Sequence, residues 1–371
     1  QATAYYSMAI AVITIVVALL GPVCGAISDH KGMKKIFFTT TVAVGVSGCI
    51  LNGFAYQWIA FLLLFAVTKI FYNMSLMFYD SMLNDITTEE RMDEVSSQGY
   101  AWGYIGSCVP FVVCLMIVLG AGKLGISMEL AMGISFFVTA AWWVLMTVPM
   151  LKTYRQKNYV ERKPHAFRES FARIGKTFLN VRKEKKIFLF LLAFFFYIDG
   201  VYTIIDMATA YGSALGLDST GLLLALLVTQ IVAFPCAILF GRLARRFRTE
   251  HLITVCVVAY IGIALFACVL RTQTQFWILA IFVGMFQGGI QALSRSYYAK
   301  IIPAEQSGEY FGLLDICGKG ASFIGTAIVS VVSQLTGDIN KGVAMIVVLF
   351  VVGVVLFRIA VTCVQKNKIE S

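Results

Sequence analysis

Two long apolar runs flank a short charged turn near the start of this 371-residue chain. The runs are Ala4–Ser28 and Ile36–Tyr56, and the turn reads Gly25-Ala-Ile-Ser-Asp29-His-Lys-Gly32-Met-Lys34-Lys35. A helix needs about 20 apolar residues to cross the hydrocarbon core of a bilayer, and each run is long enough. The sequence therefore predicts two antiparallel membrane helices joined by a tight loop.

The composition extends this prediction to the whole chain. Hydrophobic residues make up 59% of it and charged residues 13%, whereas soluble domains average about 25% charged. The net charge of +10 comes from residues in particular loops, as in membrane proteins, so we expect a lipid bilayer and no nucleic acid as partner. The nine cysteines fall mostly inside apolar runs, without zinc or disulfide spacing. We expect no metal, no cofactor and no enzymatic activity.

Eleven segments are apolar and long enough to be membrane helices, which predicts an all-α integral membrane fold. A polar stretch, residues 152–186, separates the first five from the last six. The segments are Ala4–Ser28, Ile36–Tyr56, Trp58–Tyr79, Gly99–Leu119, Leu130–Leu151, Ile187–Tyr211, Ser219–Gly241, His251–Leu270, Phe276–Tyr297, Ser307–Leu335 and Gly342–Val364.

The spacing G-x-x-x-D-x-x-G-x-K-K in the charged turn resembles the loop signature of the major facilitator superfamily. This resemblance implies two bundles of six helices related as repeats. Five helices before the polar stretch then imply that the first helix of the fold is missing from this chain. The expected domains are an N-terminal bundle (1–151), a basic amphipathic linker (152–186) and a C-terminal bundle (187–371).

Loop charge predicts the orientation in the membrane. Lysines and arginines gather in the 31–35 turn, the 152–186 linker, the 242–248 loop and the tail, and such loops face the cytoplasm. We therefore expect a cytoplasmic C-terminus. In the linker, Phe167, Phe171, Ile174 and Phe178 recur at helical spacing, which favours either an amphipathic helix at the lipid headgroups or a solvated linker helix.

Polar residues inside membrane helices are costly and tend to face a cavity or a partner. Asp199, Thr203 and Asp206 form a polar stripe on the 187–211 segment, and either aspartate is a candidate for proton coupling or solute binding. The alternative places both near the membrane boundary, hydrated or ion-paired. Lys69 and Asn73 are one turn apart on the third segment and are further candidates.

Gln287, Gln291 and Arg295 repeat every four residues and so project from one side of the 276–297 segment. They could form a wall for a polar ligand, although Arg295 could instead extend toward the cytoplasm at the helix end. Asp315 and Lys319 are four residues apart, a spacing that favours a structural ion pair.

Four stretches together resemble the Atg22-like, or UMF1, branch of the major facilitator superfamily. They are Ser96–Gly106, Phe196–Ile205, Gln287–Ser296 and Glu309–Lys319. The resemblance implies a secondary transporter that moves a small polar solute by alternating access, with amino-acid efflux as the activity of fungal relatives. A sugar or organic-acid cation symporter, a receptor and a lipid scramblase remain alternatives.

We expect a functional monomer in a plasma membrane of prokaryotic type, with transport coupled to protons or another cation. The superfamily resemblance also implies a conformational or gating role, without solute contact, for the signature loop. Its residues in this role are Gly25, Asp29, Gly32, Lys34 and Lys35.

Overall fold

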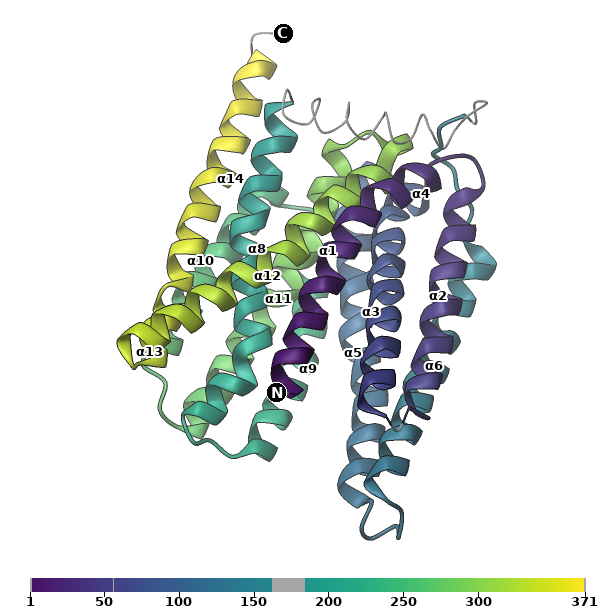
Figure 1. Cartoon of the computed structure of the whole chain (residues 1–371). Coiled ribbons are helices and arrows are strands. Elements are labelled where there is room, and N and C mark those ends of the chain that lie inside the picture. The colour runs from purple at the N-terminus through teal and green to yellow at the C-terminus, as the bar shows by residue number, and fades with distance from the viewer. Residues whose placement is uncertain (1, 56, 162–183, 370–371) are drawn as a thin grey trace. The chain divides into compact units, whose positions relative to one another are not determined.

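The computed structural model describes residues 2–55, 57–161 and 184–369, and apart from one isolated bridge their regular structure is helical (Figure 1). The long helices are α1 (Ala2–Ser28), α2 (Met33–Asn52), α3 (Trp58–Ser81), α5 (Met92–Gly120), α6 (Met128–Thr153), α8 (Lys185–Ala214), α9 (Ser219–Leu243), α10 (Thr249–Cys268), α11 (Gln273–Ile301), α12 (Ser307–Thr336) and α14 (Ile346–Ile369). Short helices are α4 (Leu83–Ile86), η1 (Glu89–Arg91), η2 (Ala304–Gln306) and α13 (Ile339–Ala344).

The long helices correspond one for one to the eleven predicted membrane segments. In the described part of the chain, 10 helices are long and apolar enough to cross a membrane. For α12, whose side chains at 319–323 lie outside the described residues, the apolar part is Ile324–Thr336. The prediction of an all-α membrane fold is confirmed.

The chain divides into two compact units whose boundaries pass through α5 and α12. Unit 1 comprises Gln1–Ile86, Gly106–Gly175 and Pro303–Asp315, and unit 2 comprises Thr87–Ile105, Lys176–Ile302 and Ile316–Ser371. The first turns of α5 thus pack with second-half helices, and the first turns of α12 pack with first-half helices. The expected domains, 1–151 and 187–371 with a linker between them, stay a prediction.

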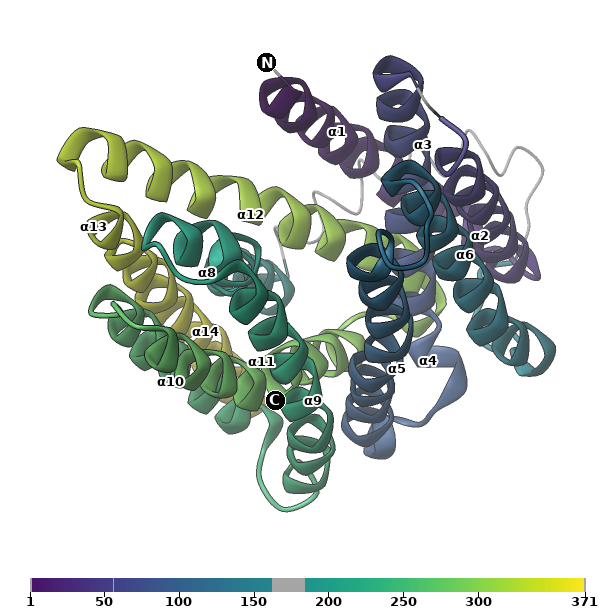
Figure 2. The same cartoon turned by 90° about the horizontal axis from the view of Figure 1, so that it is seen from below.

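In unit 1, α2 packs against α3 and α6, and α1 packs against α3 (Figure 2). Close approach depends on small residues: a Cβ on Gly45 would lie 2.5 Å from the ring of Trp143, and one on Gly48 would lie 2.4 Å from Thr68 Oγ1. Trp143 also contacts Tyr72 edge-on, with ring centroids 5.6 Å apart. Packing of small residues is the usual basis of helix association in lipid.

In unit 2, α8 packs along α14, and α11 lies between α9 and α10 (Figures 1 and 2). The α8–α14 seam is aromatic: Phe190 and Phe357 are fully buried, and their ring centroids are 6.1 Å apart. Gly353 lets the backbone of Tyr197 approach, since a Cβ there would lie 2.9 Å from the Tyr197 nitrogen. This packing fixes the orientation of α8, which carries Asp199.

Helix ends follow local sequence signals. Asp218 accepts a hydrogen bond from the Gly221 N–H at the start of α9, and Thr272 and Gln275 form a capping box at the start of α11. These side chains satisfy backbone N–H groups that a helix leaves free. Gly32 precedes α2 with φ 77°, a left-handed conformation that favours glycine.

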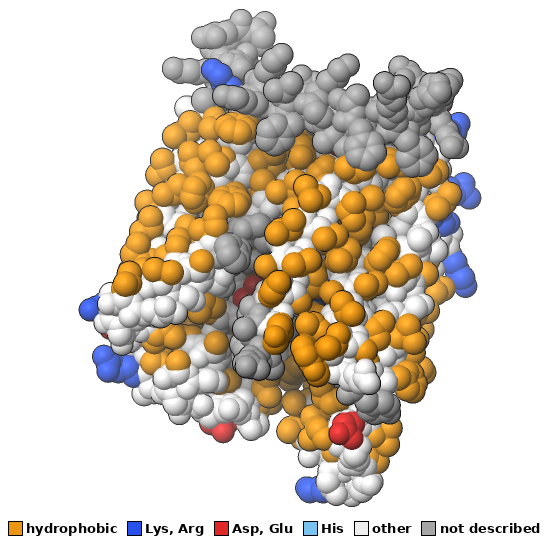
Figure 3. Space-filling model, viewed as in Figure 1, with side chains coloured by type: hydrophobic (Ala, Val, Ile, Leu, Met, Phe, Trp, Pro, Cys, Tyr) orange, Lys and Arg blue, Asp and Glu red, His pale blue; other side chains and the backbone are white. Residues whose placement is uncertain are grey.

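Apolar side chains cover most of the described surface seen in Figure 3. Leu19, Leu63 and Leu145 in unit 1 are each at least 60% exposed, and Val258 in unit 2 is 52% exposed. Exposed apolar side chains on long helices suit contact with lipid tails. The expected amphipathic helix around Phe167–Phe178 lies outside the described residues.

Candidate functional site

The signature loop, residues 25–35, places Asp29 at the start of α12 within unit 1. Asp29 is fully buried, and its two carboxylate oxygens accept hydrogen bonds from the backbone N–H groups of Gly308, at 2.7 Å, and Glu309, at 3.0 Å. These N–H groups belong to the first turn of α12, where free donors and the helix dipole favour a negative charge. The carboxylate thus ties the α1 end to the α12 start.

Glycines bring the same two helices into backbone contact. A Cβ on Gly25 would lie 2.2 Å from the Gly308 carbonyl oxygen, and one on Gly312 would lie 2.7 Å from the Pro22 backbone. Both positions therefore exclude any larger residue while α1 and α12 remain in this arrangement. A Cβ on Gly32 would meet nothing within 4 Å, so the role of this glycine is its left-handed turn.

Lys34 supplies the positive charge at this contact. Its side chain is fully buried, and Nζ donates to Ser307 Oγ at 2.7 Å. The same nitrogen lies 3.6 Å from both Asp29 Oδ1 and Asp85 Oδ2. Two buried carboxylates would be costly without this ammonium. Lys35 is exposed, and none of the described contacts joins its side chain to this cluster.

A segment following α6, residues 154–160, completes the cluster, and sequence reasoning missed it. Asp85 accepts hydrogen bonds from the Tyr154 hydroxyl at 2.6 Å and from the Asn158 N–H at 2.8 Å. The Val160 N–H donates to the Asp29 carbonyl at 2.9 Å, and Gln156 Nε2 donates to the same carbonyl at 3.4 Å. Burial, followed by the charge of Asp85, raises the pKa of the Tyr154 phenol well above its ordinary range, so the phenol stays a donor.

Unit 2 contains a second set of contacts between the sequence halves, built from α5, α10 and α11. Asp93 in the first turn of α5 accepts hydrogen bonds from Ser296 Oγ and Lys300 Nζ, both at 2.5 Å, and from Thr249 Oγ1 at 2.7 Å. Neighbouring Glu94 pairs with Arg245 at 2.5 Å. The stretch Gly241-Arg-Leu-Ala-Arg245 has the same spacing as Gly25 to Asp29, with Arg245 at the position of the aspartate.

The Gln287–Gln291–Arg295 face of α11 partly faces α5. Arg295 is 6% exposed, donates to Ser96 Oγ and to the Ser96 carbonyl at 2.9 Å each, and lies 4.5 Å from the centre of the Tyr100 ring. The alternative prediction, in which Arg295 extends toward the cytoplasm into water, is therefore wrong. Gln291 Oε1 accepts a hydrogen bond from the Tyr104 hydroxyl at 2.7 Å. Gln287 is 5% exposed, and its Oε1 has no partner among the described residues.

Asp199 lies in the middle of α8 and is fully buried. Its Oδ1 accepts hydrogen bonds from the Gly325 N–H at 2.9 Å and from Thr203 Oγ1 at 3.3 Å, whereas Oδ2 has no partner among the described residues. Gly325 on α12 is needed for this approach, because a Cβ there would lie 2.0 Å from Thr203 Oγ1. Asp199 is therefore shielded from water, whereas Asp206 on the same helix is exposed.

The remaining candidates are spread over the two units. Lys69 and Asn73 are half-buried on α3 in unit 1, and Lys69 Nζ lies 5.2 Å from the centre of the Tyr72 ring. Asp315 is half-buried near the unit boundary in α12. The side chain of Lys319 lies outside the described residues, so the predicted Asp315–Lys319 ion pair stays a prediction.

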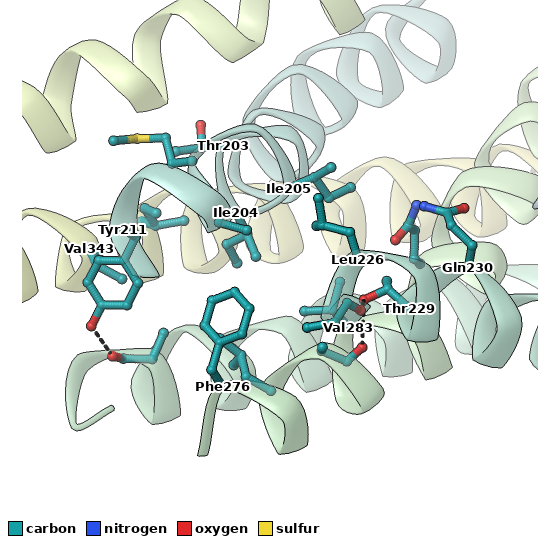
Figure 4. A pocket seen from close by; sticks show the side chains of 18 residues that line it. Thr203, Ile204, Ile205, Tyr211, Leu226, Thr229, Gln230, Phe276, Val283 and Val343 are labelled. Atoms are coloured by element: carbon teal, nitrogen blue, oxygen red, sulfur yellow. Dashed lines mark hydrogen bonds between the residues drawn. The ribbon is translucent and has the colours of Figure 1, made fainter. Parts of the chain in front are cut away.

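A cavity of about 70 Å³, lined in part by Thr203, lies inside unit 2 (Figure 4). Thr203, Ile204 and Tyr211 of α8 line one side, and Phe276 and Val283 of α11 lie across from them. Gln287 also contributes to the wall. The lining is mostly apolar, with hydroxyl and amide groups at its edges.

Comparisons with known proteins agree with this architecture. The family model described as "Vacuole effluxer Atg22 like" matches residues 83–370. The chain is 44% identical to the MFS-type transporter YxiO of Bacillus subtilis over 360 residues, which is 96% of this chain and 84% of YxiO. It is 29% identical to autophagy-related protein 22 of Cryptococcus neoformans over 315 residues, covering 79% of this chain and 54% of the fungal protein.

Solved structures of transporters share the fold. The fucose:proton symporter FucP of E. coli superposes with a TM-score of 0.73 at 14% identity, over 97% of this chain and 93% of FucP. The human organic anion transporter MFSD10 gives a TM-score of 0.66 at 12% identity, over 94% and 82% of the two chains. At such low identity the likeness concerns the fold alone.

Proposed function

We propose that this chain, which belongs to the Atg22-like family of the major facilitator superfamily, is a secondary active transporter that works by alternating access. The proposed cargo is a small polar solute, and the family resemblance implies amino acids carried outward. The protein is proposed to lie in the plasma membrane of a prokaryotic cell, with the basic loops and the C-terminus in the cytoplasm.

The buried carboxyl group of Asp199 is the single observation that carries the proposal. A carboxylate inside a membrane helix is costly, and one of its oxygens has no described partner. A structural role alone would favour a fully hydrogen-bonded group. Binding of a proton, or of a cationic group on the solute, would remove the cost, so we assign coupling or solute contact to Asp199.

The contacts at the signature loop support the alternating-access part of the proposal. Asp29 and the Gly25–Gly308 approach join a first-half helix to a second-half helix within unit 1. Helices that join through backbone contact and a few hydrogen bonds can adopt two discrete arrangements. We assign this contact to the conformer in which the ends of α1 and α12 are together, and its loss to the conformer that opens there.

The test is transport by the purified protein in proteoliposomes, with Asp199→Asn beside the wild type. If Asp199 carries a coupling proton, the variant loses uphill, proton-driven transport and keeps counterflow exchange, which needs binding and reorientation only. If Asp199 binds the solute, both activities fall together.

Glu129→Gln is the control, because Glu129 is an exposed carboxylate in the first turn of α6 and is not a site candidate. We expect this variant to keep both activities. Wild-type uphill transport by Asp199→Asn would refute both roles for Asp199. No flux of any solute by wild-type protein would instead support a receptor, and lipid movement without solute flux would support a scramblase.

A further inference from the structure

One end of unit 1 carries a group of exposed cations, here called the basic patch, that the transport proposal does not use. Its members come from the signature loop, the two ends of α2 and α6 that lie there, and the 154–160 segment: Lys31, Lys35, Lys152, Arg155 and Lys157. None of them forms an ion pair with a carboxylate of the described residues. In Figure 3, Lys and Arg side chains gather along the right-hand edge, beside α2.

The 154–160 segment brings these cations together because it lies along the signature loop. Gln156 Oε1 accepts a hydrogen bond from the Lys34 N–H at 3.4 Å, and Lys31 Nζ lies 5.1 Å from the centre of the Tyr159 ring. The two cations that flank Gln156 therefore lie beside those of the loop. Glu161 at the end of the segment is exposed, and one carboxylate leaves the group positive. Like charges held together repel one another, so an anion that contacts several of them is attracted.

The inner side of the same two segments carries the buried cluster. Asp85 accepts hydrogen bonds from the Lys157 N–H at 3.2 Å and the Asn158 N–H at 2.8 Å, while the Lys157 side chain is exposed. The Val160 N–H donates to the carbonyl of Asp29 at 2.9 Å, and Asp29 in turn binds the start of α12. A ligand that holds the outer side of the 154–160 segment therefore also holds the α1–α12 contact.

The position of the basic patch at the ends of apolar helices indicates which anion it meets. Ile36, next to Lys35, is 56% exposed, and Leu145 and Met146, within two turns of Lys152, are 60% and 52% exposed. Exposed apolar side chains on long helices suit contact with lipid tails. Cations at the adjoining helix ends extend to the level of the headgroups, where anionic lipids attract clustered Lys and Arg.

We propose that the basic patch binds the headgroup of an anionic phospholipid, and that this lipid stabilises the arrangement in which α1 and α12 are together. The phosphate lies among the cations of the signature loop and of the 154–160 segment, and the acyl chains lie along α2 and α6. The binding stands by itself. Its effect on opening rests on the alternating-access part of the proposed function.

The first test measures lipid binding to the purified full chain in detergent by titration and native mass spectrometry. Phosphatidylglycerol is compared with phosphatidylcholine of the same chains, which has no net charge, and with glycerol 3-phosphate, which has no chains. A cation near an anionic lipid contributes about fivefold to binding, so we expect phosphatidylglycerol to bind at least about fivefold more tightly than either compound. Equal binding of phosphatidylcholine would refute recognition of charge, and equal binding of glycerol 3-phosphate would refute a lipid site.

Variants then locate the site. The double variant Arg155→Gln, Lys157→Gln removes two exposed cations of the basic patch and should lower the affinity for phosphatidylglycerol about 25-fold. Arg242→Gln, Arg246→Gln is the matched control, because it removes the same charge from exposed arginines after α9 in unit 2. It should leave the affinity of the tightest site unchanged. An equal loss in both variants, or none in the first, would overturn the location.

The effect on the α1–α12 contact is measured by hydrogen–deuterium exchange of the full chain in nanodiscs. The N–H groups of Gly308 and Glu309, which bind Asp29, should exchange about tenfold more slowly when phosphatidylglycerol is present at ten times its Kd. The double variant in the 154–160 segment should lose this difference, and the control variant should keep it. Binding at the patch without slower exchange at these two groups would refute the conformational effect.

Neither measurement depends on flux. Absence of solute flux in proteoliposomes would refute the transport proposal and leave the lipid site intact, whereas flux without selective binding of phosphatidylglycerol would refute the lipid site and leave transport intact.

Discussion

Addition of one methyl group at Gly25 tests whether the α1–α12 contact controls the separation of these two helix ends. In Gly25→Ala the new Cβ would lie 2.2 Å from the Gly308 carbonyl oxygen, 2.6 Å from the Gly308 carbonyl carbon and 3.0 Å from the Glu309 nitrogen. All three neighbours are backbone atoms, which cannot move by a rotamer change. The two backbones must therefore separate by about 1 Å, which costs roughly 1–3 kcal/mol by analogy with overpacked cores.

That cost falls only on the conformer in which the contact exists. The ratio of closed to open conformers should therefore drop by about 5- to 150-fold, and the hydrogen bonds from Gly308 and Glu309 to Asp29 should weaken with it. Spin labels at Lys35 and Glu305, both exposed positions of unit 1, report the separation by pulsed electron resonance in a cysteine-free background. We expect a longer-distance population in Gly25→Ala.

Gly106→Ala in α5 is the matched control, because a Cβ there has nothing within 4 Å. It carries the same gain in helix propensity, about 1 kcal/mol, without the collision. Its distance distribution should match that of the wild type. A wild-type distribution in Gly25→Ala, or an equal shift in both variants, would refute the reasoning.

Three further outcomes follow from the same cluster and from loop charge. Lys34→Met should lower the free energy of unfolding by roughly 3–5 kcal/mol because it removes the ammonium that lies 3.6 Å from two buried carboxylates, whereas Lys35→Met at an exposed position should change it by less than about 0.5 kcal/mol; equal thermal shifts would contradict this. Asp29→Asn should slow transport and leave solute affinity within a few-fold, because it shifts a conformational equilibrium; abolished binding at normal turnover would contradict it. Single cysteines at Lys341 and Lys152 should label from opposite sides, Lys341 from outside, with an impermeant reagent on intact cells; labelling of position 152 from outside would reverse the orientation.

Hydropathy predicted the number and order of the long helices because lipid-exposed helices must be apolar along their whole length. It failed where a helix continues into polar sequence. The predicted segment Gly99–Leu119 corresponds to α5, which begins at Met92. The extra turns are polar, and Asp93 and Ser96 make hydrogen bonds to α11. Ser296, the partner of Asp93, is 203 residues away in the chain. Hydropathy averaged over a short window cannot detect a partner at that distance.

The site was likewise predictable only where a local sequence pattern marks the residue. Asp29 was identified from its loop spacing and Asp199 from its position in an apolar run, and both are fully buried. Tyr154 and Asn158 were missed because they lie in an ordinary polar stretch, and only their contacts with Asp85 give them a role. Periodicity placed Arg295 on the correct helix face, but could not show that Ser96 and Tyr100 occupy that face.

The two sets of contacts between the sequence halves differ in what they depend on. In unit 1, Asp29 binds backbone N–H groups of α12, which no substitution on α12 other than proline can remove. In unit 2, Asp93 binds the side chains of Ser296, Lys300 and Thr249, each of which can be changed singly. The unit 1 contact therefore needs glycine at Gly308 and Gly312 of α12, where a Cβ would lie 2.6 Å and 2.7 Å from α1 backbone atoms, while the unit 2 contact depends on three side chains from two helices. A change at Ser296, Lys300 or Thr249 would therefore remove one hydrogen bond of the unit 2 contact at a time, whereas a larger residue at Gly308 or Gly312 would separate α1 from α12 in unit 1.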